Sequence, residues 1–117
     1  MSLATTLTQT DQNHPPLVLI HGLGSAATAF KPIIPALAQS FRVITVDLPG
    51  HGQSTYSKGQ AMDPKSLGGA VFESVESEYG INKFHVAGNS LGGWIALEMA
   101  ADQPERIKSL TGIAPAG

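Results

Sequence analysis

The chain has 117 residues, of which 42% are hydrophobic and 14% charged, and its formal net charge at pH 7 is −2. This length indicates one domain, and this composition is enough for an apolar core, so intrinsic disorder is excluded. The charge balance provides no basic surface for a nucleic-acid backbone or an anionic membrane, and we expect neither as a partner. Because the chain has no cysteine, disulfides, thiolate metal sites and a cysteine nucleophile are excluded.

Residues 1–14 contain no Lys or Arg and no sustained apolar run, so they do not read as a signal peptide. No segment approaches the roughly 18 apolar residues of a membrane span, and we expect a cytoplasmic protein. Residues 1–14 are rich in Thr, Gln and Asn. They predict a frayed lead-in or, at most, a weak edge strand over Leu3–Thr10, with the domain itself over residues 15–117.

The first half of this domain alternates between strand and helix patterns. Leu17–Ile20 is a continuous apolar run closed by glycine, which is typical of a strand buried on both faces. Apolar residues at helical spacing follow, and they predict a helix that begins near Phe30, so that Pro32 and Pro35 fall in its first turn. Phe41–Asp47 predicts a second strand, and a loop rich in Gly, Pro and Ser comes after it.

The second half repeats the alternation. Asp63 and Pro64 have the residue types of a helix N-cap and first position, and Gly80 provides the C-terminal stop. Residues 84–89 predict a third strand, 91–101 a helix with Ile95, Ala96, Met99 and Ala100 facing inward, and 106–117 a fourth strand. This order predicts an α/β protein, a three-layer α/β/α sandwich in which right-handed crossovers build a mainly parallel sheet.

One motif carries chemistry: Gly88-Asn89-Ser90-Leu91-Gly92 fits Gly-x-Ser-x-Gly and lies between a predicted strand and a predicted helix. A serine at such a turn is expected to have positive φ, with small residues needed two places to either side. Gly88 and Gly92 meet that need, and Gly93 is expected to let the helix approach the neighbouring strand closely. The Leu91 N–H would point at an oxyanion formed on the serine. The alternative is a glycine-rich turn with a capping serine.

A second loop, His21-Gly22-Leu23-Gly24, ends the first strong strand and therefore lies at the carboxyl edge of the sheet. The N–H of Leu23 is our candidate for the second oxyanion donor. The alternative is a flexible exit loop without a catalytic part.

The segments LVLIHGLG, VITVDLPGHGQS and HVAGNSLGGW, in this order and spacing, resemble the α/β-hydrolase fold family, especially its esterases and C–C-bond hydrolases. The resemblance covers residues 15–117. It implies that Ser90 is the nucleophile, that Leu23 and Leu91 form the oxyanion hole and that Asn89 lines the pocket. By the family's layout the four main strands are its third to sixth, with the Phe41 strand outside and the Leu17 strand beside the Phe84 strand.

The family's triad runs serine, acid, histidine, and the last two follow its seventh and eighth strands. This chain ends after the predicted sixth strand, so we expect an N-terminal part of a serine hydrolase whose triad acid and histidine lie outside it. His21 and His51 are the histidines nearest the predicted site, and with Gly22 they are expected to support its loops. The alternative is that one of the two histidines acts as the general base. Asp47 is expected to brace a loop.

Two further readings stay open at this stage, a non-catalytic small-ligand binder on the same fold and an acyltransferase. The expected partner is a small-molecule substrate, without a cofactor or a metal ion. With no seventh strand, the edge over Ile107–Ala114 is expected to be unpaired and to promote self-association.

Overall fold

The computed structural model describes residues 3–8, 11–56 and 59–114. The elements, in chain order, are β1 (Thr5–Thr8), β2 (Pro16–Ile20), η1 (Ala27–Phe30), α1 (Ile34–Leu37), β3 (Arg42–Val46), α2 (Pro64–Tyr79), β4 (Phe84–Asn89), α3 (Leu91–Asp102), η2 (Pro104–Arg106) and β5 (Ile107–Ile113). None of the helices in this described part is long and apolar enough to cross a membrane.

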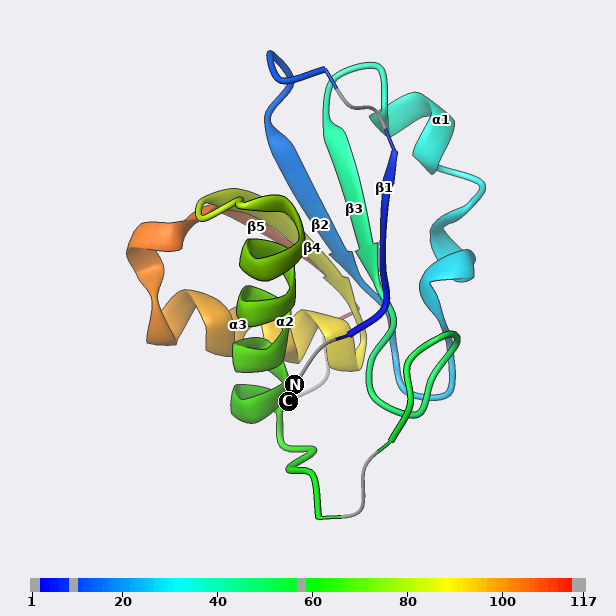
Figure 1. Cartoon of the computed structure of the whole chain (residues 1–117), viewed down its shortest axis with the longest axis vertical. Helices are drawn as coiled ribbons and strands as arrows, with labels where there is room; N and C mark the ends of the chain where they lie inside the picture. Colours follow the sequence, from blue (N-terminus) through cyan, green and yellow to red (C-terminus); the bar gives the residue numbers. More distant parts are fainter. Residues whose placement is uncertain (1–2, 9–10, 57–58, 115–117) are drawn as a thin grey trace.

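The five strands form one sheet in the order β1-β3-β2-β4-β5. The four strands β3, β2, β4 and β5 are parallel, and β1 joins β3 antiparallel. Helices α2 and α3 cover one face of the sheet, while η1 and α1 lie on the other (Figure 1). The predicted α/β sandwich and its strand order are therefore confirmed, and all four parallel strands end at the same edge.

The centre of the sheet forms the core. All five residues of β2 are buried, as the continuous apolar run predicts, because β2 has a neighbour on each side and helices on both faces. The larger cluster of buried side chains lies between the sheet and the helices α2 and α3. A smaller cluster around Leu17, Leu19, Phe30 and Val43 lies under η1 and α1.

From their sequence, residues 1–14 are expected to form either a frayed lead-in or a weak edge strand. The structure shows an edge strand, β1, and the prediction of a frayed lead-in is wrong for β1 and for Leu3. Leu3 is buried, and its N–H donates to Ser74 Oγ at 2.9 Å. The N–H of Ala4 donates to Ser54 Oγ at 2.8 Å. These bonds couple the strand to elements far along the chain, which its weak apolar pattern does not reveal. Gln9 and Thr10 lie outside the described residues.

The helix predicted to begin near Phe30 is two short segments, η1 and α1. The reason is the pair of prolines, because each lacks an N–H and clashes with the preceding turn. Pro35 occupies the first turn of α1, which starts only at Ile34.

Helix α2 has the predicted ends. The Asp63 side chain caps it by accepting the Ser66 N–H, and Gly80 ends it with φ 67°. A methyl group at Gly68 would lie 2.7 Å from Met99 Cγ, so this glycine, which lowers the helical propensity of α2, lets α3 pack closely. On α3, three of the four residues predicted to face inward are buried, whereas Ala100 is half-buried.

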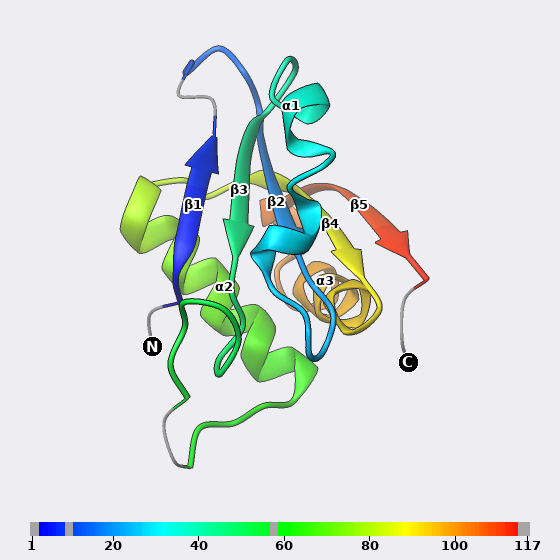
Figure 2. The same ribbon diagram turned by 90° about the vertical axis from the view of Figure 1, so that its right-hand side faces the viewer.

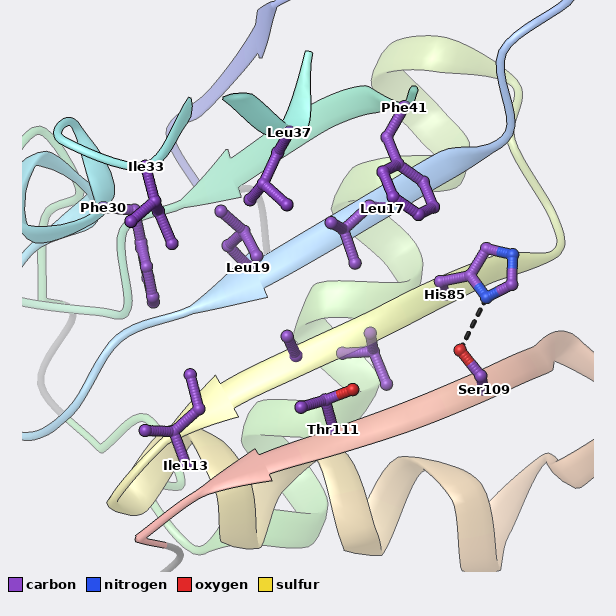
Figure 3. Close-up of a pocket in the computed structure, with 12 residues that line it drawn as sticks. Leu17, Leu19, Phe30, Ile33, Leu37, Phe41, His85, Ser109, Thr111 and Ile113 are labelled. Carbon is purple, nitrogen blue, oxygen red and sulfur yellow. Dashed lines mark hydrogen bonds between the residues drawn. The ribbon is translucent and has the colours of Figure 1, made fainter. Parts of the chain in front are cut away.

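Strand β5 is an edge of the sheet, with seven residues (Figure 2). Beside it, on the face of η1 and α1, lies a groove of about 280 Å³. Its walls are mostly apolar, with Leu17, Leu37 and Phe41 on one side and Thr111 and Ile113 of β5 on the other (Figure 3). An unpaired edge beside an apolar surface is a site where chains associate.

We propose that the chain self-associates through the β5 edge. Replacing the exposed Thr111 by Lys is expected to shift wild-type oligomers to monomer in size-exclusion chromatography with light scattering, because a lysine blunts edge pairing. The matched control is Thr55→Lys in an exposed loop, which adds the same charge and should leave the oligomers unchanged. A wild-type chain that stays monomeric over a wide concentration range would contradict the proposal.

Candidate active site

Ser90 lies between β4 and α3 with φ 55° and ψ −114°. Positive φ is uncommon for a residue other than glycine, and strain of this kind concentrates at functional sites. The Ser90 side chain is exposed, and its hydroxyl makes no hydrogen bond to the described part of the chain. Its backbone N–H donates to the Ile113 carbonyl oxygen, 3.0 Å away at the end of β5. The predicted positive φ is confirmed, and β5 holds the turn, a contact that no local pattern reveals.

Glycines are required around this turn by close backbone contacts. A methyl group at Gly88 would overlap the carbonyl of Gly92 and lie 2.5 Å from Gly93 N. A methyl group at Gly92 would overlap the Ile20 carbonyl and lie 2.8 Å from the His21 carbonyl oxygen. The helix therefore approaches the end of β2 closely at Gly92, and Gly93, where a close approach is also expected, is buried in α3.

The loop after β2, residues 21–27 (the Leu23 loop), passes directly beside Ser90. A methyl group at Gly22 would lie 3.4 Å from Ser90 Cβ, 4.0 Å from Ser90 Oγ and 3.4 Å from the Asn89 carbonyl oxygen. Asn89 is exposed at the end of β4. Leu23 has 74% of its surface exposed. Two loops predicted from separate motifs thus meet at the carboxyl edge of the sheet.

The two predicted oxyanion donors are not used elsewhere in the described residues. The Leu23 N–H makes no hydrogen bond there. The same is true of the Leu91 N–H, which as the first residue of α3 has no acceptor within its own helix. Both amides are therefore unpaired within the described residues.

The two histidines of these loops have their ring nitrogens engaged. His21 Nδ1 lies 2.7 Å from the Gly22 carbonyl oxygen, and its Nε2 accepts the Leu48 N–H at 3.0 Å. His51 Nδ1 lies 2.9 Å from the Pro49 carbonyl oxygen, and its Nε2 accepts the Gly24 N–H at 2.9 Å. Neither ring has a nitrogen left for Ser90.

Asp47 braces the loop that follows β3, residues 47–54 (the His51 loop). Its carboxylate accepts the N–H of Ala27 at 2.8 Å and that of Gln53 at 3.0 Å. The Ser54 hydroxyl donates to the Asp47 backbone carbonyl at 2.5 Å. Asp47 thus ties the Leu23 loop to the His51 loop and has no contact with a ring nitrogen that would make it a triad acid.

The other two histidines lie elsewhere. His14 is paired with Asp11 at 3.3 Å. His85 Nδ1 lies 2.6 Å from Ser109 Oγ on the wall of the apolar groove (Figure 3). Among the residues that the structure describes, no group of three or more His, Asp or Glu is placed to hold a metal ion.

Burial lowers the pKa of His21 below its ordinary value of 6.5, and the neighbouring His51 acts in the same direction, against the bond to the Gly22 carbonyl. The unfolded chain therefore binds a proton more readily than the folded chain. We expect the free energy of unfolding to fall as the pH drops below 6.5 and through the lower pKa of the folded state.

Urea titrations at several pH values measure this dependence. His21→Gln keeps an acceptor for the Leu48 N–H and cannot titrate, so its unfolding free energy should vary less over the same pH range. A variant with the wild-type pH dependence would show that His21 is not the responsible group.

The chain is similar in sequence to one known protein family. The sequence profile of the family described as "alpha/beta hydrolase fold" matches residues 15–116. The chain belongs to the α/β-hydrolase family. The predicted resemblance is thereby confirmed over nearly the whole chain.

Two curated proteins and one solved structure show the kinds of protein to which this chain is similar. The dihydrolipoyllysine-residue acetyltransferase component of the acetoin cleaving system of Pseudomonas putida is 42% identical over 87% of this chain and 27% of its own. The pimeloyl-(acyl-carrier protein) methyl ester esterase of Methylococcus capsulatus is 37% identical over 88% of this chain and 38% of its own. The structure of 2-hydroxy-6-oxo-6-phenylhexa-2,4-dienoate hydrolase from Rhodococcus sp. strain RHA1 superposes with a TM-score of 0.82, at 33% identity, over 97% of this chain and 42% of its own. The chain thus spans less than half the length of these relatives.

Proposed function

We propose that this chain carries the nucleophile and the oxyanion hole of a serine hydrolase that acts on an ester or a related carbonyl substrate. The observation that carries the proposal is the strained, exposed Ser90. Beside it, the N–H groups of Leu23 in the Leu23 loop and of Leu91 at the start of α3 are unpaired in the described residues. A glycine-rich turn with a capping serine does not require this strain, because an N-cap serine normally has extended backbone angles and bonds the helix N-terminus.

In the proposed reaction Ser90 Oγ attacks the substrate carbonyl carbon, its proton passes to a base and the carbonyl oxygen becomes an oxyanion. The N–H groups of Leu23 and Leu91 stabilise that oxyanion. Expulsion of the leaving group gives an acyl-serine, which water hydrolyses in the second half of the reaction. Because the ring nitrogens of His21 and His51 are engaged with the backbone, the base and its orienting acid are expected from residues outside this chain.

A chimera tests this proposal. Residues 15–114 replace the matching segment of the Methylococcus capsulatus esterase, and hydrolysis of p-nitrophenyl butyrate is measured. We expect turnover that disappears with Ser90→Ala, while circular dichroism and melting show that both chimeras are folded. A folded chimera without turnover, or one whose turnover survives Ser90→Ala, would overturn the assignment.

Acyl transfer is a second candidate, favoured by the similarity to the acetyltransferase component of Pseudomonas putida. It uses the same acyl-serine and differs only in which nucleophile, water or an added thiol, takes the acyl group. The same chimera separates the two when the ratio of thioester to free acid is measured in the presence of a thiol. A non-catalytic binder predicts neither product.

A further inference from the structure

Three hydrogen bonds join the Leu23 loop to the His51 loop, and in each of them a side chain accepts a backbone N–H. These bonds run from Gly24 N–H to His51 Nε2 (2.9 Å), from Leu48 N–H to His21 Nε2 (3.0 Å) and from Ala27 N–H to Asp47 Oδ1 (2.8 Å). The bond to His51 is the one nearest the site, because Gly24 directly follows Leu23. Gly24 has φ 76°, and a methyl group there would contact nothing within 4 Å, so packing does not fix this part of the loop.

The bond partners define the tautomer of His51. The Pro49 carbonyl oxygen, 2.9 Å from His51 Nδ1, can only accept, so Nδ1 carries the proton. The Gly24 N–H can only donate, so Nε2 must present its lone pair. Both bonds are satisfied only by the neutral ring. A second proton on Nε2 would set two donors against each other.

We propose that His51 is a positioning residue that holds the Leu23 N–H in place through Gly24, and that it does so only while its imidazole is neutral. This inference rests on the proposed oxyanion role of Leu23. Protonation of His51 removes the acceptor of the Gly24 N–H and frees the loop at the residue beside the donor. The oxyanion hole is thus formed with the neutral ring and loosened when the ring gains a second proton.

Two other titratable groups lie in the loops around His51, and they are His21 and Asp47. His21 packs against His51 with ring centroids 5.0 Å apart and is itself neutral by the same hydrogen-bond argument. Asp47, the acidic group of these two loops, directs its carboxylate to the N–H groups of Ala27 and Gln53.

NMR spectroscopy of the 117-residue chain tests the coupling without any activity. Long-range ¹H–¹⁵N correlation should show His51 with a protonated Nδ1 and an unprotonated Nε2 at neutral pH. On acidification the Gly24 amide shift should follow the titration of the His51 ring. A protonated Nε2 at neutral pH, or a Gly24 amide that ignores the ring titration, would overturn the proposal.

Two substitutions of His51 distinguish the effect of its hydrogen-bond acceptor from the effect of the size of its ring. His51→Gln keeps an oxygen that can accept the Gly24 N–H, and its Gly24 amide should stay protected and no longer respond to acid. His51→Phe keeps the ring without an acceptor, and hydrogen exchange at Gly24 should rise about fivefold to tenfold, as for the loss of one hydrogen bond. The same substitutions at His85, in the distant groove, are the matched controls and should leave Gly24 unchanged.

Kinetics of the chimera then link the coupling to catalysis. His51→Phe is expected to lower kcat about 10- to 100-fold with KM unchanged, because a donor displaced by an ångström loses most of its effect, and His51→Gln should restore kcat. A chimera in which His51→Phe leaves kcat unchanged would overturn the positioning role. If the chimera has no Ser90-dependent activity while the Gly24 amide follows His51, the proposed function has failed and the loop coupling stands.

Discussion

Replacement of Gly92 by Ala is expected to destabilise the fold by about 3 kcal/mol or more, the upper range for an overpacked site. The added methyl group would overlap the Ile20 carbonyl and approach that of His21, which are backbone atoms at the end of the central strand β2. Neither the strand nor the start of α3 can retreat without breaking sheet hydrogen bonds or the Ser90 turn. Because whole domains are stable by only about 5–15 kcal/mol, much of the chain should be unfolded or aggregated.

The unfolding free energy from urea titration, with soluble expression yield, measures this effect. Gly69→Ala is the matched control, since Gly69 is an exposed glycine of α2 with nothing within 4 Å of an added methyl group. It is expected to stabilise the chain by about 0.5–1 kcal/mol. Gly92→Ala with wild-type stability would mean that the helix and strand are less closely packed than the structure has them.

The 117-residue chain alone is expected to hydrolyse p-nitrophenyl acetate no faster than its Ser90→Ala variant. A neutral serine hydroxyl is a weak nucleophile until a base removes its proton. The ring nitrogens of His21 and His51 contact backbone groups. His14 lies beside Asp11, and His85 Nδ1 lies 2.6 Å from Ser109 Oγ on the wall of the apolar groove. Enzymes of this kind that lose triad members retain only about 10³- to 10⁴-fold catalysis over water.

Spectrophotometry of p-nitrophenol release, with equal amounts of wild type and Ser90→Ala, measures the difference. The folded chimera described above serves as the positive control for the same serine. Robust turnover by the isolated chain that depends on Ser90 and falls with His21→Gln or His51→Gln would show that one of these histidines is the base, and the expectation of an outside base would be wrong.

The sequence by itself determined most of the secondary structure and the fold class. Continuous apolar runs locate β2 and β3, since strands buried on both faces leave that pattern. Asp63, Pro64 and Gly80 locate both ends of α2 because capping is local chemistry. The spacing of Gly88, Ser90 and Gly92 between a strand and a helix likewise predicts the strained turn.

Only the tertiary structure decided which groups meet. Leu3–Thr8 carries a weak pattern, and β1 forms because β3 offers its open edge and Ser54 and Ser74 supply partners for the backbone. The two prolines between 30 and 36 suit one helix start, but the structure divides the segment into η1 and α1. The pairing of His51 with Gly24 and of Ile113 with Ser90 joins residues far apart in the chain. A sequence pattern records local propensity and burial, whereas these contacts depend on how parallel strands bring their carboxyl ends to one edge, and that is set by the packing of the whole sheet.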